Sequence, residues 1–233
     1  MTPIIPDRPC HIISYAEPVP YLTALAQQYT LAERRGCGAV PDTLLLLEHP
    51  PTITLGRASR EADLLTDEGS LRARGIAVEP VDRGGEVSYH GPGQLVGYPI
   101  LDLREHGQDL HRYLRDLEEV LIQTLAFYGL KGERVPGRTG VWVEDRKIAA
   151  IGIKVSRWVS LHGWALNITT DLAPFRRDIV PCGIHDRDVA SLAELLGGRC
   201  PSRTEVEAHV VRAFADQFHV QPVFRPETGI LTP

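Results

Sequence analysis

The chain has 233 residues, of which 43% are hydrophobic and 24% are charged, and its formal net charge is -5. This length fits one large domain better than two small ones, so we expect a single domain over residues 1–233. No stretch reaches about 18 consecutive apolar residues and the N-terminus lacks a signal-peptide pattern, which predicts a cytoplasmic protein without a membrane span. The negative net charge argues against a nucleic-acid partner.

In chain order, the pattern predicts a helix over 21–35, strands between it and a second helix, and further strands before a third helix. Apolar residues at helical spacing mark the second and third helices at 110–125 and 204–218. The third opens with TEVE, in which Thr204 and Glu207 form a capping-box pattern. The β-type runs are 43–49, 52–55, 76–81, 94–103, 140–144, 147–155 and 164–169. Strands follow strands with helices inserted at intervals, which predicts an α+β fold with a mixed β-sheet flanked by helices.

Both ends of the chain are rich in proline. Residues 2–9 read TPIIPDRP and residues 221–233 read QPVFRPETGILTP. Such segments are expected to lie loosely on the surface.

A glycine-rich stretch, RGGEVSYHGPGQLVGYP, runs from Arg83 to Pro99. Its glycines permit positive φ angles or the close approach of a ligand, so a phosphate cradle, an acyl-chain pocket and a pair of ordinary turns all fit the pattern. A Walker loop is excluded because no G-K-[ST] follows, and a dinucleotide fingerprint is excluded because Pro92 and a β-type run come next. His90 in this stretch is a candidate base or a buried structural histidine.

One cysteine stands in a turn that could expose its sulfur. Cys182 lies between Pro181 and Gly183, ahead of a helix expected to start near Ser191. A nearby cation or helix N-terminus would lower the pKa of such a thiol and make it a nucleophile, and an inert buried thiol is the alternative. The four cysteines show no C-x-x-C spacing, which argues against a zinc site, so we expect no metal.

The stretch GVWVEDRKIAAIGIKVS predicts a hairpin with a strand over 140–144, a turn at 145–146 and a strand over 147–155. Lys147 and Lys154 are seven positions apart, so on an unbroken strand they point to opposite faces. Only one of the two lysines can therefore face a common site, and a solvated surface lysine is the alternative for each.

Two further glycines interrupt apolar runs. Gly152 predicts a β-bulge or the close approach of a ligand. Gly163 lies in LHGWALNIT, where His162 and Trp164 lead into a half-buried strand. A turn followed by a core tryptophan is the structural alternative for that stretch.

Together these stretches resemble the lipoyl(octanoyl) transferase family, whose members move an octanoyl group from acyl carrier protein to a lysine of lipoyl domains. The resemblance spans most of the chain and rests on EHPPTITLGR (48–57), RGGEVSYHGPGQLVGYP, TGVWV…RKIAAIGIKVS…LHGWALNI and PCGI, in that order. It implies the fold that this family shares with the catalytic domains of lipoate and biotin protein ligases. That fold is a mixed sheet flanked by helices, in agreement with the α+β prediction.

The resemblance also implies a role for each matching residue. Cys182 matches the cysteine that carries the acyl group as a thioester, and Lys147 matches the lysine that activates it. The matching segments of the acyl-pocket wall are Arg83, Gly84, Gly85, Glu86, Val87, Ser88, Tyr89, His90, Ala150, Ile151, Gly152, Gly163, Trp164 and Ala165.

The implied donor is octanoyl-acyl carrier protein, and the implied acceptors are lipoyl domains of 2-oxoacid dehydrogenase complexes and the glycine cleavage H protein. Because thioester exchange is nearly isoenergetic and aminolysis of a thioester runs downhill, no nucleotide or other cofactor is expected. The carrier protein is acidic, so docking predicts a local basic patch drawn from Arg57, Arg60, Arg157, Arg176 and Arg177.

Two other functions fit the same resemblance. One is an ATP-dependent lipoate or biotin protein ligase, and the other is a non-catalytic acyl-binding protein of the same fold. A ligase holds an acyl-adenylate and needs no nucleophilic thiol, so the presence of both Cys182 and Lys147 argues against both alternatives.

Overall fold

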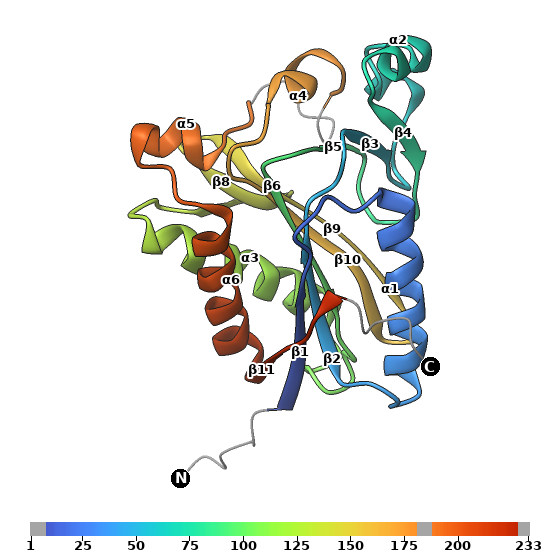
Figure 1. The fold of residues 1–233 in the computed structure, drawn as a ribbon, viewed down its shortest axis with the longest axis vertical. Coiled ribbons are helices and arrows are strands. Elements are labelled where there is room, and N and C mark those ends of the chain that lie inside the picture. The colour runs from blue at the N-terminus through green and yellow to red at the C-terminus, as the bar shows by residue number, and fades with distance from the viewer. Residues whose placement is uncertain (1–7, 181–187, 228–233) are drawn as a thin grey trace.

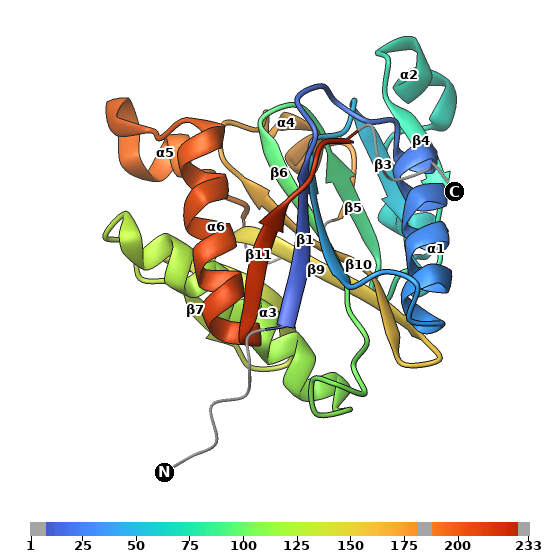
Figure 2. The same ribbon diagram turned by 60° about the horizontal axis from the view of Figure 1, so that its bottom comes forward.

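The computed structural model describes residues 8–180 and 188–227 of the chain. It has a large mixed sheet and a smaller sheet with helices packed on their faces (Figures 1 and 2), which confirms the predicted α+β class. Within the described residues, no helix is both long enough and apolar enough to cross a membrane.

The large sheet has the strand order β11-β1-β2-β6-β10-β9-β8-β7. β1 runs parallel to β2 and β11, and the other neighbouring pairs are antiparallel. Its strands are β1 (Arg8–Ser14), β2 (Asp42–Leu47), β6 (Gln94–Ile100), β7 (Glu133–Val135), β8 (Arg138–Val143), β9 (Arg146–Ser156), β10 (Val159–Asn167) and β11 (Val220–Phe224).

The smaller sheet has the order β4-β3-β5 and lies beside β9 and β10, near α2 in Figure 1. Its strands are β3 (Thr52–Leu55), β4 (Ala77–Pro80) and β5 (Val87–His90). The helices are α1 (Tyr21–Gly36), η1 (Glu61–Asp63), α2 (Glu68–Ala73), α3 (Leu110–Phe127), α4 (Ala173–Arg177), α5 (Leu192–Leu196), η3 (Gly197–Arg199) and α6 (Arg203–Phe218).

Helices cover both faces of the large sheet, which explains why β2 is buried along its whole length. Leu44 and Leu46 face the core built with α3 and α6, whereas Leu45 and Leu47 face the core built with α1. A strand covered on both faces reads as a continuous apolar run rather than as an alternating one. The sequence TLLLL therefore reflects the three-layer arrangement seen in Figure 1.

The third predicted helix begins earlier than its sequence pattern indicated. The N-cap of α6 is Ser202, whose side chain accepts a hydrogen bond from the backbone of Glu205, and the Glu205 carboxylate bonds back to Ser202. The predicted capping box at Thr204 and Glu207 is wrong, because SRTE two residues earlier offers the same pattern. Glu207 pairs instead with Arg203 at 2.7 Å.

The predicted hairpin forms, but its turn lies one residue earlier than expected. Glu144 and Asp145 have φ angles of 49° and 64°, and Arg146 already belongs to β9. Two consecutive positive φ values are typical of the tight hairpin turns that match strand twist. The prediction of a loose C-terminal end is wrong for residues 221–224, which pair with β1 as the edge strand β11. Pro222 is tolerated there because an edge strand does not need every N–H.

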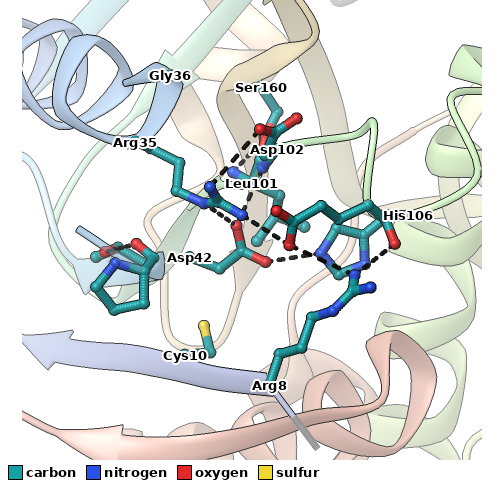
Figure 3. A network of polar contacts seen from close by, with 12 residues as sticks. Arg8, Cys10, Arg35, Gly36, Asp42, Leu101, Asp102, His106 and Ser160 are labelled. Carbon is teal, nitrogen blue, oxygen red and sulfur yellow. Dashed lines mark hydrogen bonds and ion pairs between the residues drawn. The ribbon is translucent and has the colours of Figure 1, made fainter. Parts of the chain in front are cut away.

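A buried network of charges joins α1, β2 and the loop after β6 (Figure 3). Asp42 lies between Arg35 and His106, at 2.7 Å from the Arg35 Nε and 2.7 Å from the His106 Nε2. Arg35 also pairs with Glu105 at 3.0 Å and lies 3.6 Å from Asp102. Asp42 is only 2% exposed, so this end of the sheet buries an ion-pair network beside its apolar core.

Candidate active site

A pocket opens between β9, β10, the small sheet and the loop before β5. We call it the main pocket. Thirteen of the fourteen predicted wall residues line it, and they are Arg83, Gly84, Gly85, Glu86, Val87, Ser88, His90, Ala150, Ile151, Gly152, Gly163, Trp164 and Ala165. Residues from three separate stretches of sequence therefore meet around one space.

Tyr89 is the predicted wall residue that the structure places elsewhere. Its ring packs edge-on against Phe175, with ring centroids 5.5 Å apart, and it belongs to the core beneath the small sheet. Ser88 and His90, its two neighbours on β5, line the main pocket.

Lys147 lies beside the main pocket, in two adjoining hollows. The first, the Lys147 cleft, shares the loop residues Gly84–Glu86 and the β9 residues Ile151 and Gly152 with the main pocket. The second, the linking hollow, shares Ser88, Ala150 and Ala165 with it. A chain seated in the main pocket can thus end next to the Lys147 amine.

The side chain of Lys147 is buried and packed on an indole. It is 5% exposed, and its Nζ lies 5.0 Å from the centroid of the Trp142 ring. The contact fixes the amine at the rim shared by the cleft and the linking hollow.

Cys182 lies outside the described residues, but both flanks of its segment are hydrogen bonded, and the flank at 188–190 bonds to Lys147. The Lys147 N–H donates to the Asp188 carbonyl at 2.9 Å, and the Ala190 N–H donates to the Lys147 carbonyl at 2.9 Å. On the other flank, the Val180 N–H donates to the Asp63 carbonyl at 2.9 Å. The chain therefore leaves and re-enters the described structure at fixed points, one of them paired with Lys147 itself.

His90 serves as a structural anchor within a chain of hydrogen bonds. Its Nδ1 lies 2.8 Å from the Gln94 side-chain oxygen, the Gln94 amide donates to Asn167 at 2.9 Å, and the Asn167 amide donates to the Ala190 carbonyl at 3.0 Å. Because Gln94 uses its nitrogen as donor, its oxygen accepts from the His90 Nδ1–H. Burial, aided by His49 and Arg83, holds the pKa of His90 well below its ordinary value, so the ring is neutral.

The loop that begins at Arg83 is clamped onto β9. The Gly84 N–H donates to the Ile153 carbonyl at 2.8 Å, and the Arg83 guanidinium donates to the Thr54 carbonyl at 2.9 Å. A Cβ on Gly152 would lie 2.9 Å from the Gly84 carbonyl oxygen and 3.1 Å from the Arg83 Cδ. The predicted close approach at Gly152 is therefore made by the chain's own loop.

Substituting Gly152 by alanine should displace this loop. Because the nearest atom is backbone, we expect a loss of about 1–3 kcal/mol in the free energy of unfolding, with a higher KM for whatever occupies the main pocket. Thermal denaturation and steady-state kinetics measure the two effects. The matched control is Gly198→Ala, where an added Cβ meets no atom within 4 Å. Equal effects of the two variants would contradict the clamp.

The second lysine of the hairpin lies against α1, away from Lys147. The two lysines are not on an unbroken strand, because the pairing of β8 with β9 shifts register at a bulge between them, so their spacing does not fix the faces on which they lie. Lys154 pairs with Asp82 at 2.5 Å and donates to the Tyr29 hydroxyl at 3.1 Å, so it lies against α1. Burial raises the pKa of Asp82, but hydrogen bonds from Lys154, Tyr29 and His162 outweigh it and hold this pKa below its ordinary range. Lys154 thus stabilises a carboxylate outside the pocket.

Three pocket residues were not proposed from the sequence as part of the wall: Tyr21, Tyr98 and His162. They come from the start of α1, from β6 and from β10, and all are less than 5% exposed. A polar aromatic side chain within an apolar run is the signal that could have indicated them, since such residues need a buried partner.

Comparison with known protein families adds a direct match. Residues 20–215 match the model of the lipoyl protein ligase A/B catalytic domain. A protein named octanoyltransferase from Nostoc sp. is 53% identical over 207 residues, covering 88% of this chain and 90% of the relative. An octanoyltransferase from Chloroflexus aurantiacus is 51% identical over 213 residues, covering 90% and 95%.

Solved structures show the same fold at low sequence identity. A lipoate-protein ligase A bound with ATP superposes with a TM-score of 0.72 at 19% identity, covering 97% of this chain and 91% of the ligase. A biotin protein ligase from Aquifex aeolicus gives a TM-score of 0.53 at 13% identity, covering 89% and 68%. These likenesses concern the fold.

Proposed function

Because the chain belongs to the family of lipoyl protein ligase A/B catalytic domains, we propose that it is an octanoyltransferase that acts through a thioester on Cys182. The octanoyl group comes from acyl carrier protein and passes to a lysine of a lipoyl domain. The enzyme works in the cytoplasm, as a single catalytic domain over residues 1–233. The observation that carries this proposal is the position of Lys147, at the mouth of the main pocket and hydrogen bonded to the segment that follows Cys182.

The reaction has two balanced steps. In the first, Lys147 accepts the Cys182 thiol proton, the sulfur attacks the donor thioester carbonyl, and the carrier thiol leaves with that proton. In the second, the acceptor lysine amine attacks the enzyme thioester, an amide forms, and the Cys182 sulfur leaves and regains a proton. A positioned amine suits both transfers, because general acid–base groups act on the same proton in each direction.

The acyl chain occupies the main pocket. A buried methylene contributes about 0.8 kcal/mol, so an eight-carbon chain gains several kcal/mol from an apolar slot. Val87, Ala150, Ile151 and Ala165 supply aliphatic walls. Gly152 and Gly163 are glycines because the backbone of Gly84 and of Gly97 approaches them closely. The carbonyl carbon then lies near Ser88 and Ala150, where the linking hollow reaches Lys147.

The proposed acceptors are lipoyl domains of 2-oxoacid dehydrogenase complexes and the glycine cleavage H protein. Among the solved structures of the same fold is a bi-partite lipoate protein ligase from Thermoplasma acidophilum described with its E2 lipoyl domain. That fold therefore accommodates a lipoyl-domain partner in another protein, which supports the proposed acceptor class here.

Transfer without a nucleotide separates this activity from that of a ligase. The enzyme, octanoyl-acyl carrier protein and an apo lipoyl domain should yield an octanoylated domain in the absence of ATP, as measured by its mass. Free octanoate with ATP should give none. A strict requirement for ATP would show instead that the chain is a ligase.

The proposed carrier-docking patch narrows to arginines near the Lys147 cleft. Arg57 and Arg60 are exposed beside Ala58, which lines the cleft, and Arg176 pairs with Asp188 at 2.9 Å, next to the strand paired with Lys147. Arg157 is ten residues from Lys147 along β9 and the turn after it, which is about 30 Å at about 3.3 Å per residue. We therefore do not include Arg157 in the patch.

Reversing two charges of this patch should weaken donor binding. For Arg57→Glu combined with Arg60→Glu we expect the KM for octanoyl-acyl carrier protein to rise about 5- to 30-fold, because rim charges steer acidic partners. With a small thioester that lacks the carrier protein, the double variant and the wild type should have similar KM values. Arg157→Glu is the matched control and should leave the KM unchanged; an equal rise there would refute the patch.

A further inference from the structure

The main pocket has one end that Lys147 does not reach. Eight residues of the main pocket line neither the cleft nor the linking hollow, and three of these eight, Tyr21, Tyr98 and His162, come from α1, β6 and β10. These three side chains, which we call the end wall, are 4%, 3% and 1% exposed. By contrast Gly84–Glu86, at the mouth, are partly exposed. The main pocket is thus open at the Lys147 end and closed at the end wall.

The end wall is held rigid by hydrogen bonds directed away from the pocket. His49 donates from Nδ1 to the Val19 carbonyl at 2.6 Å, so its Nε2 accepts from the Tyr98 hydroxyl at 2.7 Å. The Tyr21 ring packs against His49 with centroids 4.9 Å apart. Both tyrosine rings are therefore fixed from behind by the same buried histidine.

His162 closes the wall between the two tyrosines. Its Nε2 lies 2.9 Å from the Asp82 carboxylate, so Nδ1 is free to accept from the Tyr21 hydroxyl at 3.4 Å. The backbone N–H of His162 donates to the Gln28 side chain of α1 at 2.7 Å. Moving the wall back would break bonds to α1 and to the loop that carries Arg83.

We infer that the end wall sets the maximum length of the acyl chain, an inference that rests on the proposed function. Along β10 the pocket runs from Ala165 to His162, about 10 Å at about 3.3 Å per residue, which is close to the length of an extended eight-carbon chain. A longer chain must press its methyl end against hydroxyls and an imidazole that already bond one another. Such overpacking is unfavourable because the wall cannot relax without losing buried hydrogen bonds.

The test compares acylation rates across donors that differ only in chain length. Wild-type enzyme receives hexanoyl-, octanoyl-, decanoyl-, dodecanoyl- and tetradecanoyl-acyl carrier protein, and the acyl-enzyme is followed by intact mass. We expect Tyr21→Leu to raise the ratio of dodecanoyl to octanoyl rates by about tenfold or more, the discrimination that one methylene carries in an apolar pocket. Tyr21→Phe keeps the ring and should keep the wild-type profile.

Tyr89→Leu is the matched control. Tyr89 is also 4% exposed, but its ring faces Phe175 rather than the pocket, so its length profile should match wild type whatever its total rate. An unchanged profile in folded Tyr21→Leu would overturn the inference, whereas wild type that forms no adduct at any length would overturn the proposed function. If Tyr21→Leu does not fold, a structure of the wild type with bound octanoate tests the inference instead, by showing where the methyl end of the chain lies. A methyl end against Tyr21 supports the inference, and a methyl end elsewhere overturns it.

Discussion

Replacing Lys147 by methionine should slow formation of the acyl-enzyme by about 10²–10⁴-fold, the usual contribution of a general acid–base group. Methionine retains most of the aliphatic stem that packs near Trp142, so the loss reports the amine rather than a cavity. The rate constant is measured by quenching the reaction with octanoyl-acyl carrier protein and recording the intact mass. KM for the donor should change much less than the rate, because the acyl chain is held by other residues.

Lys154→Met is the control for this experiment. Lys154 is paired with Asp82 against α1 and does not line the main pocket, the cleft or the linking hollow. Its replacement should slow formation of the acyl-enzyme by less than about tenfold, through a small shift of the Asp82 loop. If Lys154→Met were the slower variant, the assignment of Lys147 as the proton-transfer group would be wrong.

Asp42→Asn should lower the free energy of unfolding by about 3–5 kcal/mol, the usual cost of removing one partner from a buried ion pair. Asparagine cannot balance the Arg35 guanidinium, which is 8% exposed and bonds the Asp42 carboxylate at 2.7 Å (Figure 3). Urea denaturation gives the change directly. The matched control is Glu133→Gln, which breaks an exposed pair with Lys131 and should cost less than about 1 kcal/mol.

The same network predicts how stability depends on acid. Burial raises the pKa of Asp42, but hydrogen bonds and charge from His106 and Arg35 outweigh it, so this pKa lies below its ordinary value. A carboxylate with a lowered folded pKa contributes its full stability above its unfolded pKa, about 3.9, and loses it as the pH falls through the folded pKa. The free energy of unfolding of the wild type should therefore fall below about pH 4. Asp42→Asn has no carboxylate to protonate at this position, so its free energy of unfolding should fall less steeply over the same pH range. If the free energy of unfolding fell equally steeply with pH in the two proteins, this role for Asp42 would be contradicted.

Most of the fold follows from local patterns, and the exceptions have a common cause. The helices α1, α3 and α6 and the runs TITL and KIAAIGIKV carry strong periodicity or β-branched residues, and they were placed to within a few positions. β1 and β11 were missed because each contains a proline, which made both ends of the chain resemble loose surface segments. Their pairing joins segments about two hundred residues apart, and no local pattern encodes such a contact.

The candidate site divides in the same way. Its glycine loop and its lysine are visible as motifs, because loops that approach backbone closely require glycine. The end wall is not visible, since Tyr21 reads as the first residue of an amphipathic helix and Tyr98 as part of an apolar strand. Only the packing of α1 against β6 and β10 brings these rings to the pocket.

The most direct test of the whole account is the intact mass of the protein after incubation with octanoyl-acyl carrier protein in the absence of ATP. Wild type should gain one octanoyl group that hydroxylamine removes, and Cys182→Ser should gain no hydroxylamine-labile group. An adduct that persists on Cys182→Ser, or wild type that stays unmodified until ATP is added, would contradict the thioester mechanism.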